Sequence, residues 1–175
     1  PGVGEEHKAL AKRYRNLAAF GVMVSDTTRG RVLPGLFGYP FTAFYSLKRE
    51  DAEKLHKGIG YLADIFFAAG AKRVFTGCYP MPVLGSKAEL KRFKGMRFKP
   101  RHFEVMAFHP LGTCRMGNDP RQSVLDLKLE THDIKGLFIP DGSPFPTSLG
   151  VNPQETIMAF ADRTAGYIAK HIGRY

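Results

Sequence analysis

The spacing of apolar side chains predicts two amphipathic helices. After Arg49-Glu50-Asp51, apolar residues recur at helical spacing, and Gly70 follows where such a helix would end. A second stripe begins after Asn152-Pro153, so we expect Asn152 to cap this helix and Pro153 to be its first residue. A weaker, basic helical pattern runs from His7 to Phe20. The two stripes are Leu55, Ile59, Leu62, Ile65, Phe66 and Ala69, and then Ile157, Ala161, Thr164, Ile168 and Ile172.

Short apolar segments bounded by turn residues predict strands elsewhere. Residues 21–26 and 30–33 are expected to form two strands around a polar turn, with residues 41–47 available to pair with them. Residues 103–108 are expected to form a strand that runs into His109, and residues 136–139 a compact strand before a turn. Because no long helix separates the first three segments, antiparallel pairing is expected. The pattern therefore predicts an α+β fold.

Composition excludes several classes of protein. The chain has 175 residues, of which 43% are hydrophobic and 12% aromatic, which argues against intrinsic disorder. The two cysteines, Cys78 and Cys114, are too few for a disulfide-stapled mini-protein or a Cys-rich zinc site. No apolar run reaches the roughly 18 residues of a membrane span. We expect a globular chain without a membrane-spanning helix.

The net charge of +10 favours anionic partners, and much of it lies in one stretch. From Lys87 to Arg101 the sequence has seven Lys and Arg residues and one acidic residue, Glu89, with Phe93 and Phe98 between them. Such interleaving occurs on surfaces that bind single-stranded nucleic acid. The stretch has no nucleic-acid-binding motif, however, and Gly95 and Pro100 interrupt it, so a solvated loop or short helix is favoured.

Residues 58–63 fit the Gly-x-Gly-x-x-Ala pattern of dinucleotide-binding proteins. That pattern binds phosphates only where a strand precedes the glycines and a helix begins at them. Here the preceding residues 53–57 are helical in character. We therefore expect Gly58 and Gly60 to lie inside a helix with no cofactor role.

Three motifs follow one another in the last third of the chain. They are His109-Pro110-Leu111-Gly112-Thr113-Cys114-Arg115-Met116-Gly117, Gly136-Leu137-Phe138-Ile139-Pro140-Asp141-Gly142-Ser143-Pro144-Phe145-Pro146 and Gly150-Val151-Asn152-Pro153-Gln154-Glu155-Thr156-Ile157-Met158-Ala159. Their order and spacing resemble the C-terminal part of the glucose–methanol–choline family of flavin oxidoreductases. The run from Ser148 to Pro153 is similar to the cholesterol-oxidase and long-chain-alcohol-oxidase branches.

The resemblance implies an architecture within α+β. Residues 1–130 would form a substrate-binding domain, an antiparallel sheet with flanking helices that carries the catalytic histidine near its end. Residues 131–175 would return to the FAD domain, supplying a strand and a helix that complete a Rossmann-like fold whose main part is absent from this chain. The family's Gly-x-Gly-x-x-Gly unit is also absent.

The resemblance also assigns roles to individual residues. His109 would accept the proton of the alcohol, a task that suits an imidazole near neutral pH, and Asn152 would orient the substrate oxygen. Asp141 and Gly142 would lie against FAD. Asn152, Pro153 and Gln154 would bring the positive end of the last helix to the flavin.

Without the resemblance, each of these residues has an ordinary structural interpretation. His109 would be a turn histidine, Asn152 a helix cap and Asp141-Gly142 a turn. His7, His102 and His132 have no Cys or carboxylate partners at metal-ligand spacing, so no metal is assigned. Because a cap turns its carboxamide toward its own helix, the two interpretations of Asn152 exclude each other.

The chain is thus expected to be the catalytic C-terminal portion of an FAD-dependent alcohol oxidase or dehydrogenase, as a fragment or as one subunit of a split enzyme. Its partners would be an alcohol, the N-terminal FAD-binding portion and an electron-acceptor protein, without nucleic acid. Alone it should be inactive and bind little or no FAD. The alternative is a non-catalytic assembly module that docks an acidic redox partner. The particular alcohol, the electron acceptor, the oligomeric state and the compartment, cytoplasmic or periplasmic, stay open.

Overall fold

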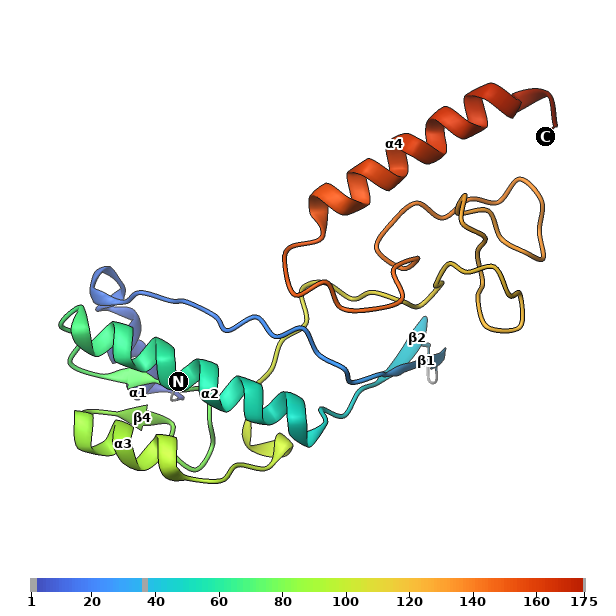
Figure 1. The fold of residues 1–175 in the computed structure, drawn as a ribbon. Helices are drawn as coiled ribbons and strands as arrows, with labels where there is room; N and C mark the ends of the chain where they lie inside the picture. The colour runs from blue at the N-terminus through green and yellow to red at the C-terminus, as the bar shows by residue number, and fades with distance from the viewer. Residues whose placement is uncertain (1–2, 36–37, 175) are drawn as a thin grey trace. The chain divides into compact units, whose positions relative to one another are not determined.

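A computed structural model describes residues 3–35 and 38–174, which form two compact units (Figure 1). The first unit joins the chain up to Val24 with Leu47–Val105, and the second joins Ser25–Ser46 with the chain from Met106 onward. Small antiparallel sheets and helices make up the described chain, which confirms the α+β class. The proposed assignment of residues 1–130 and 131–175 to substrate and FAD domains concerns a larger protein and stays a prediction.

Helix α2, Arg49–Ala68, organises the first unit and confirms the predicted central helix. Gly70 has a φ of +88°, which is the left-handed conformation that favours glycine. Its N–H donates to Phe67 O at 3.2 Å, and the Ala71 N–H donates to Phe66 O at 2.9 Å. These two bonds form a Schellman motif, so Gly70 ends the helix as predicted.

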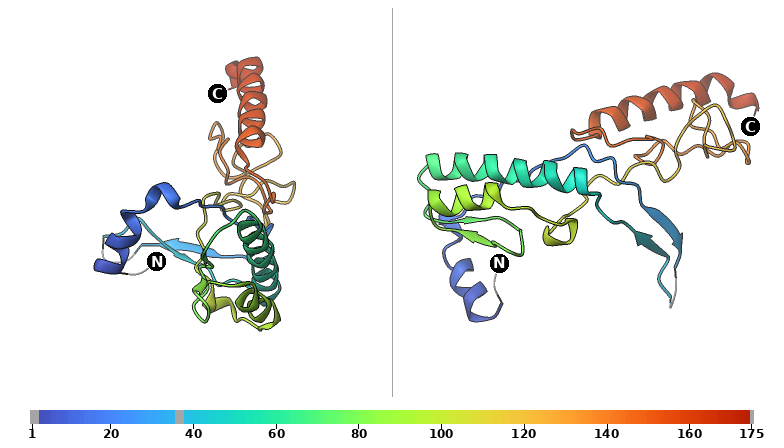
Figure 2. Two further views of the ribbon diagram at one scale, coloured as in Figure 1. Left: turned by 90° about the vertical axis from the view of Figure 1, so that its left-hand side faces the viewer. Right: turned by 60° about the horizontal axis from the view of Figure 1, so that its bottom comes forward.

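Helix α3, Lys87–Gly95, lies beside α2 and completes the core of the first unit (Figure 2). The Ser86 hydroxyl accepts the Glu89 N–H at 3.2 Å and caps the helix. Phe93 is fully buried, and its ring lies 4.9 Å from the His56 ring and 5.0 Å from the Phe98 ring. Strands β3 (Val74–Phe75) and β4 (Val83–Leu84) pair antiparallel beside them, and the 3-10 helix η2 covers Pro100–His102. The buried core consists of Ala52, Ala63, Val74, Cys78, Leu84, Leu90, Phe93 and Phe103.

The glycines of the dinucleotide-like pattern lie inside α2, as expected from the sequence. A Cβ built at Gly58 would come within 2.5 Å of Val22 Cγ1, and one built at Gly60 would lie 3.3 Å from Lys94 Cγ. Both glycines therefore let a side chain from another segment, Val22 or Lys94, lie close to the α2 backbone. Packing against α2 accounts for the Gly-x-Gly-x-x-Ala pattern.

The N-terminal segment is less helical than predicted. Helix α1 covers Glu5–Ala11 and a 3-10 turn, η1, covers Tyr14–Asn16, after which the backbone is extended from Leu17. Helix α1 buries no residue, so no packing extends it toward Phe20. The predicted strand at residues 21–26 is wrong, because these residues pair with no strand of the described chain; Val22, for example, lies against Gly58 of α2. The preceding Phe20 contacts the Phe66 ring edge-on at 5.7 Å.

In the second unit, β1 (Arg31–Pro34) pairs antiparallel with β2 (Phe41–Phe44), with Leu33 opposite Thr42. Residues 30–33 were expected to form a strand beside residues 21–26, and that pairing is wrong. The expectation that residues 41–47 could pair with them is confirmed by β2. Most of the hairpin's side chains are exposed, including Phe41 and Phe44 at 58% each. A two-stranded hairpin that buries so little is only marginally stable by itself.

Two further predicted strands are wrong in the described part of the chain. In residues 103–108, only Phe103 forms an isolated bridge, to Cys78, and in residues 136–139 only Phe138 does, to Glu130. Extended backbone becomes a strand only beside a partner edge, and the described residues provide one position of pairing in each case. Residues 105–110 are exposed, with Phe108 at 74%.

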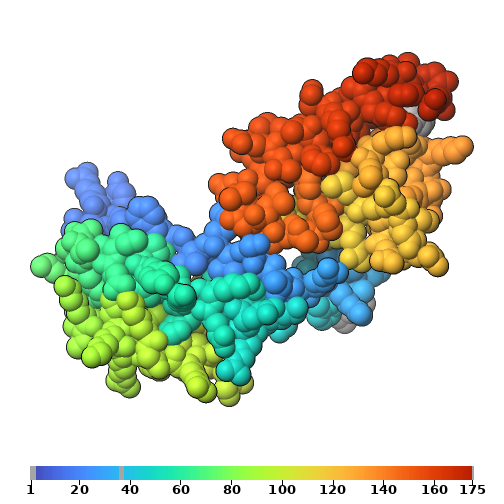
Figure 3. Space-filling model, in the orientation of Figure 1, coloured from blue at the N-terminus to red at the C-terminus, as the bar shows by residue number. Residues whose placement is uncertain are grey.

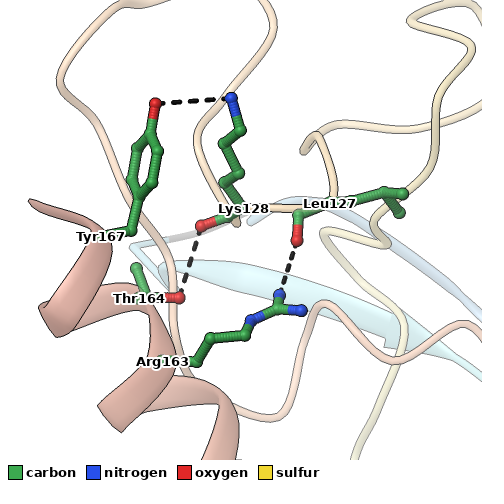
Figure 4. Close-up of a pocket in the computed structure, with 5 residues that line it drawn as sticks. All are labelled: Leu127, Lys128, Arg163, Thr164 and Tyr167. Carbon is green, nitrogen blue, oxygen red and sulfur yellow. Dashed lines mark hydrogen bonds between the residues drawn. The ribbon is translucent and has the colours of Figure 1, made fainter.

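Helix α4, Gln154–His171, followed by η3 (Ile172–Arg174), confirms the predicted C-terminal helix. It is tied to the turn that precedes Leu129, whose φ of 69° is in the left-handed region. The Thr164 hydroxyl donates to Lys128 O at 3.3 Å, and the Arg163 guanidinium donates to Leu127 O at 2.5 Å (Figure 4). Thr164 is fully buried, so this contact holds α4 on the turn. No helix in the described part of the chain combines the length and apolar character that a membrane span needs.

Candidate functional site

The first two motifs lie side by side in the second unit. The Cys114 N–H donates to Ser143 O at 3.2 Å, and the Met116 N–H donates to Pro144 O at 2.8 Å. These backbone bonds join the segment that follows His109 to the turn that follows Asp141. Residues some 30 positions apart in the chain are thereby held in fixed register.

Gly142 is the point at which the three motifs meet. A Cβ built there would lie 3.2 Å from Leu111 Cδ2, 3.4 Å from Pro110 O and 3.5 Å from Ile157 Cδ1. The residue after His109 and the first turns of α4 therefore both pack on Gly142. The adjacent Phe145 is buried, and its ring contacts Phe160 of α4 edge-on at 5.1 Å.

Asp141 shapes the turn in front of Gly142. Its Oδ1 accepts the Ser143 N–H at 2.7 Å and the Ser143 hydroxyl at 2.6 Å. The side chain is exposed, and no hydrogen bond from another described residue reaches its Oδ2. This oxygen can accept a hydrogen bond from a ligand.

The start of α4 differs by one residue from the prediction. Pro153 is the N-cap, with φ −84° and ψ 0°, its carbonyl accepts the Ile157 N–H at 2.9 Å, and Gln154 is the first helical residue. The prediction that Asn152 caps the helix was wrong, because Pro153 already lies at the helix boundary and no side chain caps it. Asn152 is exposed, and its carboxamide makes no hydrogen bond within the described chain. Of the two interpretations of Asn152, the ordinary cap is excluded.

His109 lies in the exposed segment just before the Gly142 contact. It makes no hydrogen bond to any residue in the described ranges, and it directly precedes Pro110, whose carbonyl faces Gly142. The structure thus joins the backbone segments that carry His109, Asp141 and Asn152. The chemical roles assigned to these side chains stay predictions.

Ser25 belongs to this assembly, although the sequence analysis did not single it out. Its hydroxyl donates to Ser148 O at 3.1 Å. A Cβ built at Gly150, where φ is +71°, would lie 3.0 Å from Ser25 Cβ. The loop that leads to Asn152 is therefore held by a residue 123 positions from Ser148. The glycine was a visible signal of unusual backbone, but nothing in the sequence pointed to Ser25.

A Ser–His–Asp cluster near the first motif serves the fold. His132 Nε2 lies 3.0 Å from Ser123 Oγ and 3.2 Å from Gly117 O, so it donates to a carbonyl. The Ser123 hydroxyl donates to the backbone carbonyl of Asp119 at 2.7 Å. Nucleophilic catalysis requires the serine hydroxyl to donate its proton to the histidine. Here the Ser123 hydroxyl donates to a carbonyl instead, so the cluster is not arranged for that chemistry. Hydrogen bonds from the side chain and backbone of Arg121 hold the pKa of the Asp119 carboxyl below its usual value.

Metal ligands are not grouped in the described ranges. Among residues 3–35 and 38–174, no three His, Cys, Asp or Glu side chains are close enough to hold a metal ion. Cys78 and Cys114 are both free thiols, the first buried and the second half-buried. Burial raises the pKa of the Cys78 thiol to about 11.

Comparison with known proteins places these motifs in a family. The family described as GMC oxidoreductase matches residues 37–161. The chain is 33% identical over 174 residues to an uncharacterized GMC-type oxidoreductase of Mycobacterium tuberculosis, covering 99% of this chain and 27% of that protein. It is 34% identical over 125 residues to a long-chain-alcohol oxidase of Arabidopsis thaliana, covering 67% of this chain and 17% of the relative. A 2-methyl-1,2-propanediol dehydrogenase of Mycolicibacterium austroafricanum is 46% identical over 63 residues, 36% of this chain and 11% of the relative. The chain spans about a quarter of the length of the first of these relatives and belongs to the GMC oxidoreductase family.

Proposed function

We propose that the chain is the catalytic C-terminal portion of an FAD-dependent alcohol oxidoreductase. Family membership supports an oxidoreductase of alcohol-oxidase type. The observation that carries the assignment to these residues is the junction at Gly142, where the segments following His109 and Asn152 pack together. A site for a small alcohol needs such convergence of distant segments.

The start of α4 fits an electron-rich group such as a flavin ring edge. The first backbone N–H groups of a helix lack helical partners, and no side chain caps α4. These groups and the helix dipole favour a negatively polarised ligand there. Asn152, Pro153 and Gln154 would hold the flavin at this end, and Asp141 and Gly142 would contact the remainder of FAD. Leu111 occupies the side of Gly142 on which a Cβ would lie. Gly142 would therefore contact FAD through its backbone atoms on another side.

FAD, when bound, supplies the acceptor for the hydride of the alcohol. His109 takes the hydroxyl proton on an imidazole nitrogen, and general base help of this kind contributes about 10²–10⁴ in rate. Asn152 donates its amide N–H to the substrate oxygen and fixes the position of the carbinol carbon. Its freedom from capping leaves the carboxamide available for this contact.

The exposed apolar residues of the second unit are consistent with a further portion of protein. The hairpin exposes Phe41 and Phe44, and the segment before His109 exposes Met106 and Phe108 at 73% and 74%. Large exposed apolar patches mark surfaces that another protein covers. We propose that the FAD-binding portion covers them, so the isolated chain should bind no stoichiometric flavin.

The test compares variants of the assembled protein, with its FAD-binding portion present. Primary alcohols and sterols are offered with an artificial electron acceptor to wild type, His109→Ala and Asn152→Ala, with exposed His7→Ala as a matched control. We expect His109→Ala to lose about 10²-fold or more in kcat, and Asn152→Ala to lose kcat/KM. Equal activity in all variants would overturn the assignment of His109 and Asn152. A stoichiometric yellow cofactor bound by this chain alone would contradict the expectation that the isolated chain binds no stoichiometric flavin.

A further inference from the structure

The positive charge of the chain is concentrated in the first unit. Residues 1–24 and 47–105 contain 17 Lys and Arg against 8 Asp and Glu, a net charge of +9. The second unit, which holds the three motifs, contains 9 against 8, a net charge of +1. The excess positive charge therefore lies outside the unit that carries the three motifs. The proposed catalytic role of those motifs does not explain it.

Most of this excess, a net charge of +6, lies in the segment from Lys87 to Arg101, which begins with helix α3. Helix α3 buries Leu90 and Phe93 in the core, whereas Lys87, Lys91 and Arg92 are exposed. Figure 3 shows the yellow-green segment that contains them at the molecular surface. The one acidic residue of the segment, Glu89, accepts the Gly85 N–H at 2.5 Å and forms no ion pair in the described chain. We call the exposed basic residues without an ion-pair partner in the described ranges the basic face: Lys87, Lys91, Arg92, Arg97, Lys99 and Arg101.

The aromatic residues of this stretch are not available to nucleic acid bases. Phe93 is fully buried, and Phe98 is half-buried with its ring 5.7 Å from Phe103. Binding of single strands depends on exposed aromatic rings between the basic residues. Because the two rings within residues 87–101 are buried or half-buried, successive bases would find no row of rings to stack on, which argues against a nucleic acid partner.

A membrane surface is also a poor fit. Basic amphipathic helices bind membranes by inserting their apolar face below the headgroups. Here that face, Leu90 and Phe93, packs in the core of the folded unit. Only electrostatic attraction would remain.

An exposed aromatic residue borders the basic face and favours a protein partner. Tyr79 is 85% exposed, and its N–H donates to His102 O at 2.8 Å, next to Arg101. Tyrosine and arginine are enriched where protein interfaces gain most of their binding energy. We propose that the basic face, with Tyr79 at its border, docks an acidic surface of a partner protein.

If the basic face docks an acidic partner, binding of that partner should depend on salt, whereas alcohol oxidation at the catalytic motifs should not depend on the basic face. Complementary charge mainly raises the rate of association, and salt screens it beyond about 8–10 Å. Binding should therefore weaken steeply with ionic strength. Oxidation of an alcohol with a small neutral electron acceptor should not change when the basic face is altered.

The experiment uses the protein that contains this chain and poly-L-glutamate as the acidic probe. Binding is titrated at about 0.05 and 0.15 M salt, where screening differs appreciably. The test variant reverses three charges of the basic face, and a second variant replaces the same residues with glutamine in case reversal disturbs folding. The positions are Lys87, Lys91 and Arg92.

A matched control reverses three exposed charges elsewhere in the same unit, at Lys12, Arg13 and Arg15. It changes the net charge by the same amount as the test variant. We expect the test variant to bind poly-L-glutamate at least about tenfold more weakly, the glutamine variant to be intermediate, and the control to stay within about threefold of wild type. Equal weakening in test and control would show that net charge, not this surface, is responsible, and would overturn the proposal.

Two further probes distinguish the partner class. Oligothymidylate and phosphatidylcholine vesicles containing phosphatidylserine are titrated under the same conditions. Tighter binding of either probe than of poly-L-glutamate at about 0.15 M salt, lost in the test variant, would assign the basic face to nucleic acid or membrane and overturn the proposal. Absence of poly-L-glutamate binding by wild type would also overturn it.

Discussion

Alanine at position 150 should destabilise the loop that leads to Asn152, by an amount that the geometry allows us to work out. Gly150 has a φ of +71°, a conformation that costs a residue with a Cβ about 1–2 kcal/mol. The new Cβ would lie 3.0 Å from Ser25 Cβ, and such overpacking costs about 1–3 kcal/mol. We expect Gly150→Ala to lower the free energy of unfolding by about 2–5 kcal/mol. In the assembled enzyme, the displaced loop should also lower kcat/KM.

Urea unfolding of wild type and four variants separates the two costs. Gly70→Ala is the matched control, because Gly70 also has a positive φ but no atom lies within 4 Å of its Cβ position. Ser25→Gly removes the opposing Cβ, so the double variant Ser25→Gly/Gly150→Ala should lose less stability than the sum of the single variants, by about 1 kcal/mol or more. If Gly150→Ala costs no more than Gly70→Ala and the double variant is additive, the contact with Ser25 does not hold the loop.

Three further outcomes follow from the packing of each unit. Thr164→Val should lower the free energy of unfolding by about 1–2 kcal/mol in urea, because it leaves the Lys128 carbonyl without its donor; an unchanged midpoint would refute that contact. Phe93→Ala should cost about 3–5 kcal/mol, and a loss below 1 kcal/mol would mean that the ring is not in a packed core. At pH 8 an alkylating reagent should label Cys114 before Cys78, because the raised pKa of Cys78 keeps its thiol protonated and burial shields it. Mass spectrometry measures the order of labelling, and equal rates in the native protein would contradict it.

The two amphipathic helices, α2 and α4, were predicted well because their signals are local. The apolar stripe of α2 and the glycine at its end are both visible within about 20 residues of sequence. The same rules placed the end of α2 at Gly70, whose backbone bonds belong to the helix itself. At α4 the rules missed by one residue, because proline is compatible with both the boundary and the first turn.

Strands were predicted poorly because a strand depends on a partner elsewhere in the chain. Residues 21–26 and 103–108 are short apolar segments of the kind that form strands, yet in the described ranges the first pairs with no strand and the second has one bridging residue. Local sequence indicates extended backbone, while the folded neighbourhood decides whether a ladder forms.

The candidate site shows the same division between local and distant information. The motif order identified which segments belong together, and contacts at Gly142 join these segments in space. The hydrogen bond from Ser25 to Ser148 spans 123 residues and leaves no trace in local pattern. A serine in an extended, polar stretch resembles any loop serine until its partner is known.

Glycines inside the helices have a practical consequence for anyone who wishes to produce a more robust version of this chain. Exchanging a helical glycine for alanine commonly adds about 0.5–1 kcal/mol of stability. At position 58 the added methyl group would collide with Val22, whereas position 166 in α4 has no atom within 4 Å of the added carbon. Gly166→Ala should therefore raise the melting temperature and Gly58→Ala should lower it, although both glycines occupy the middle of a regular helix. Substitutions chosen by helix propensity alone would treat the two positions as equivalent.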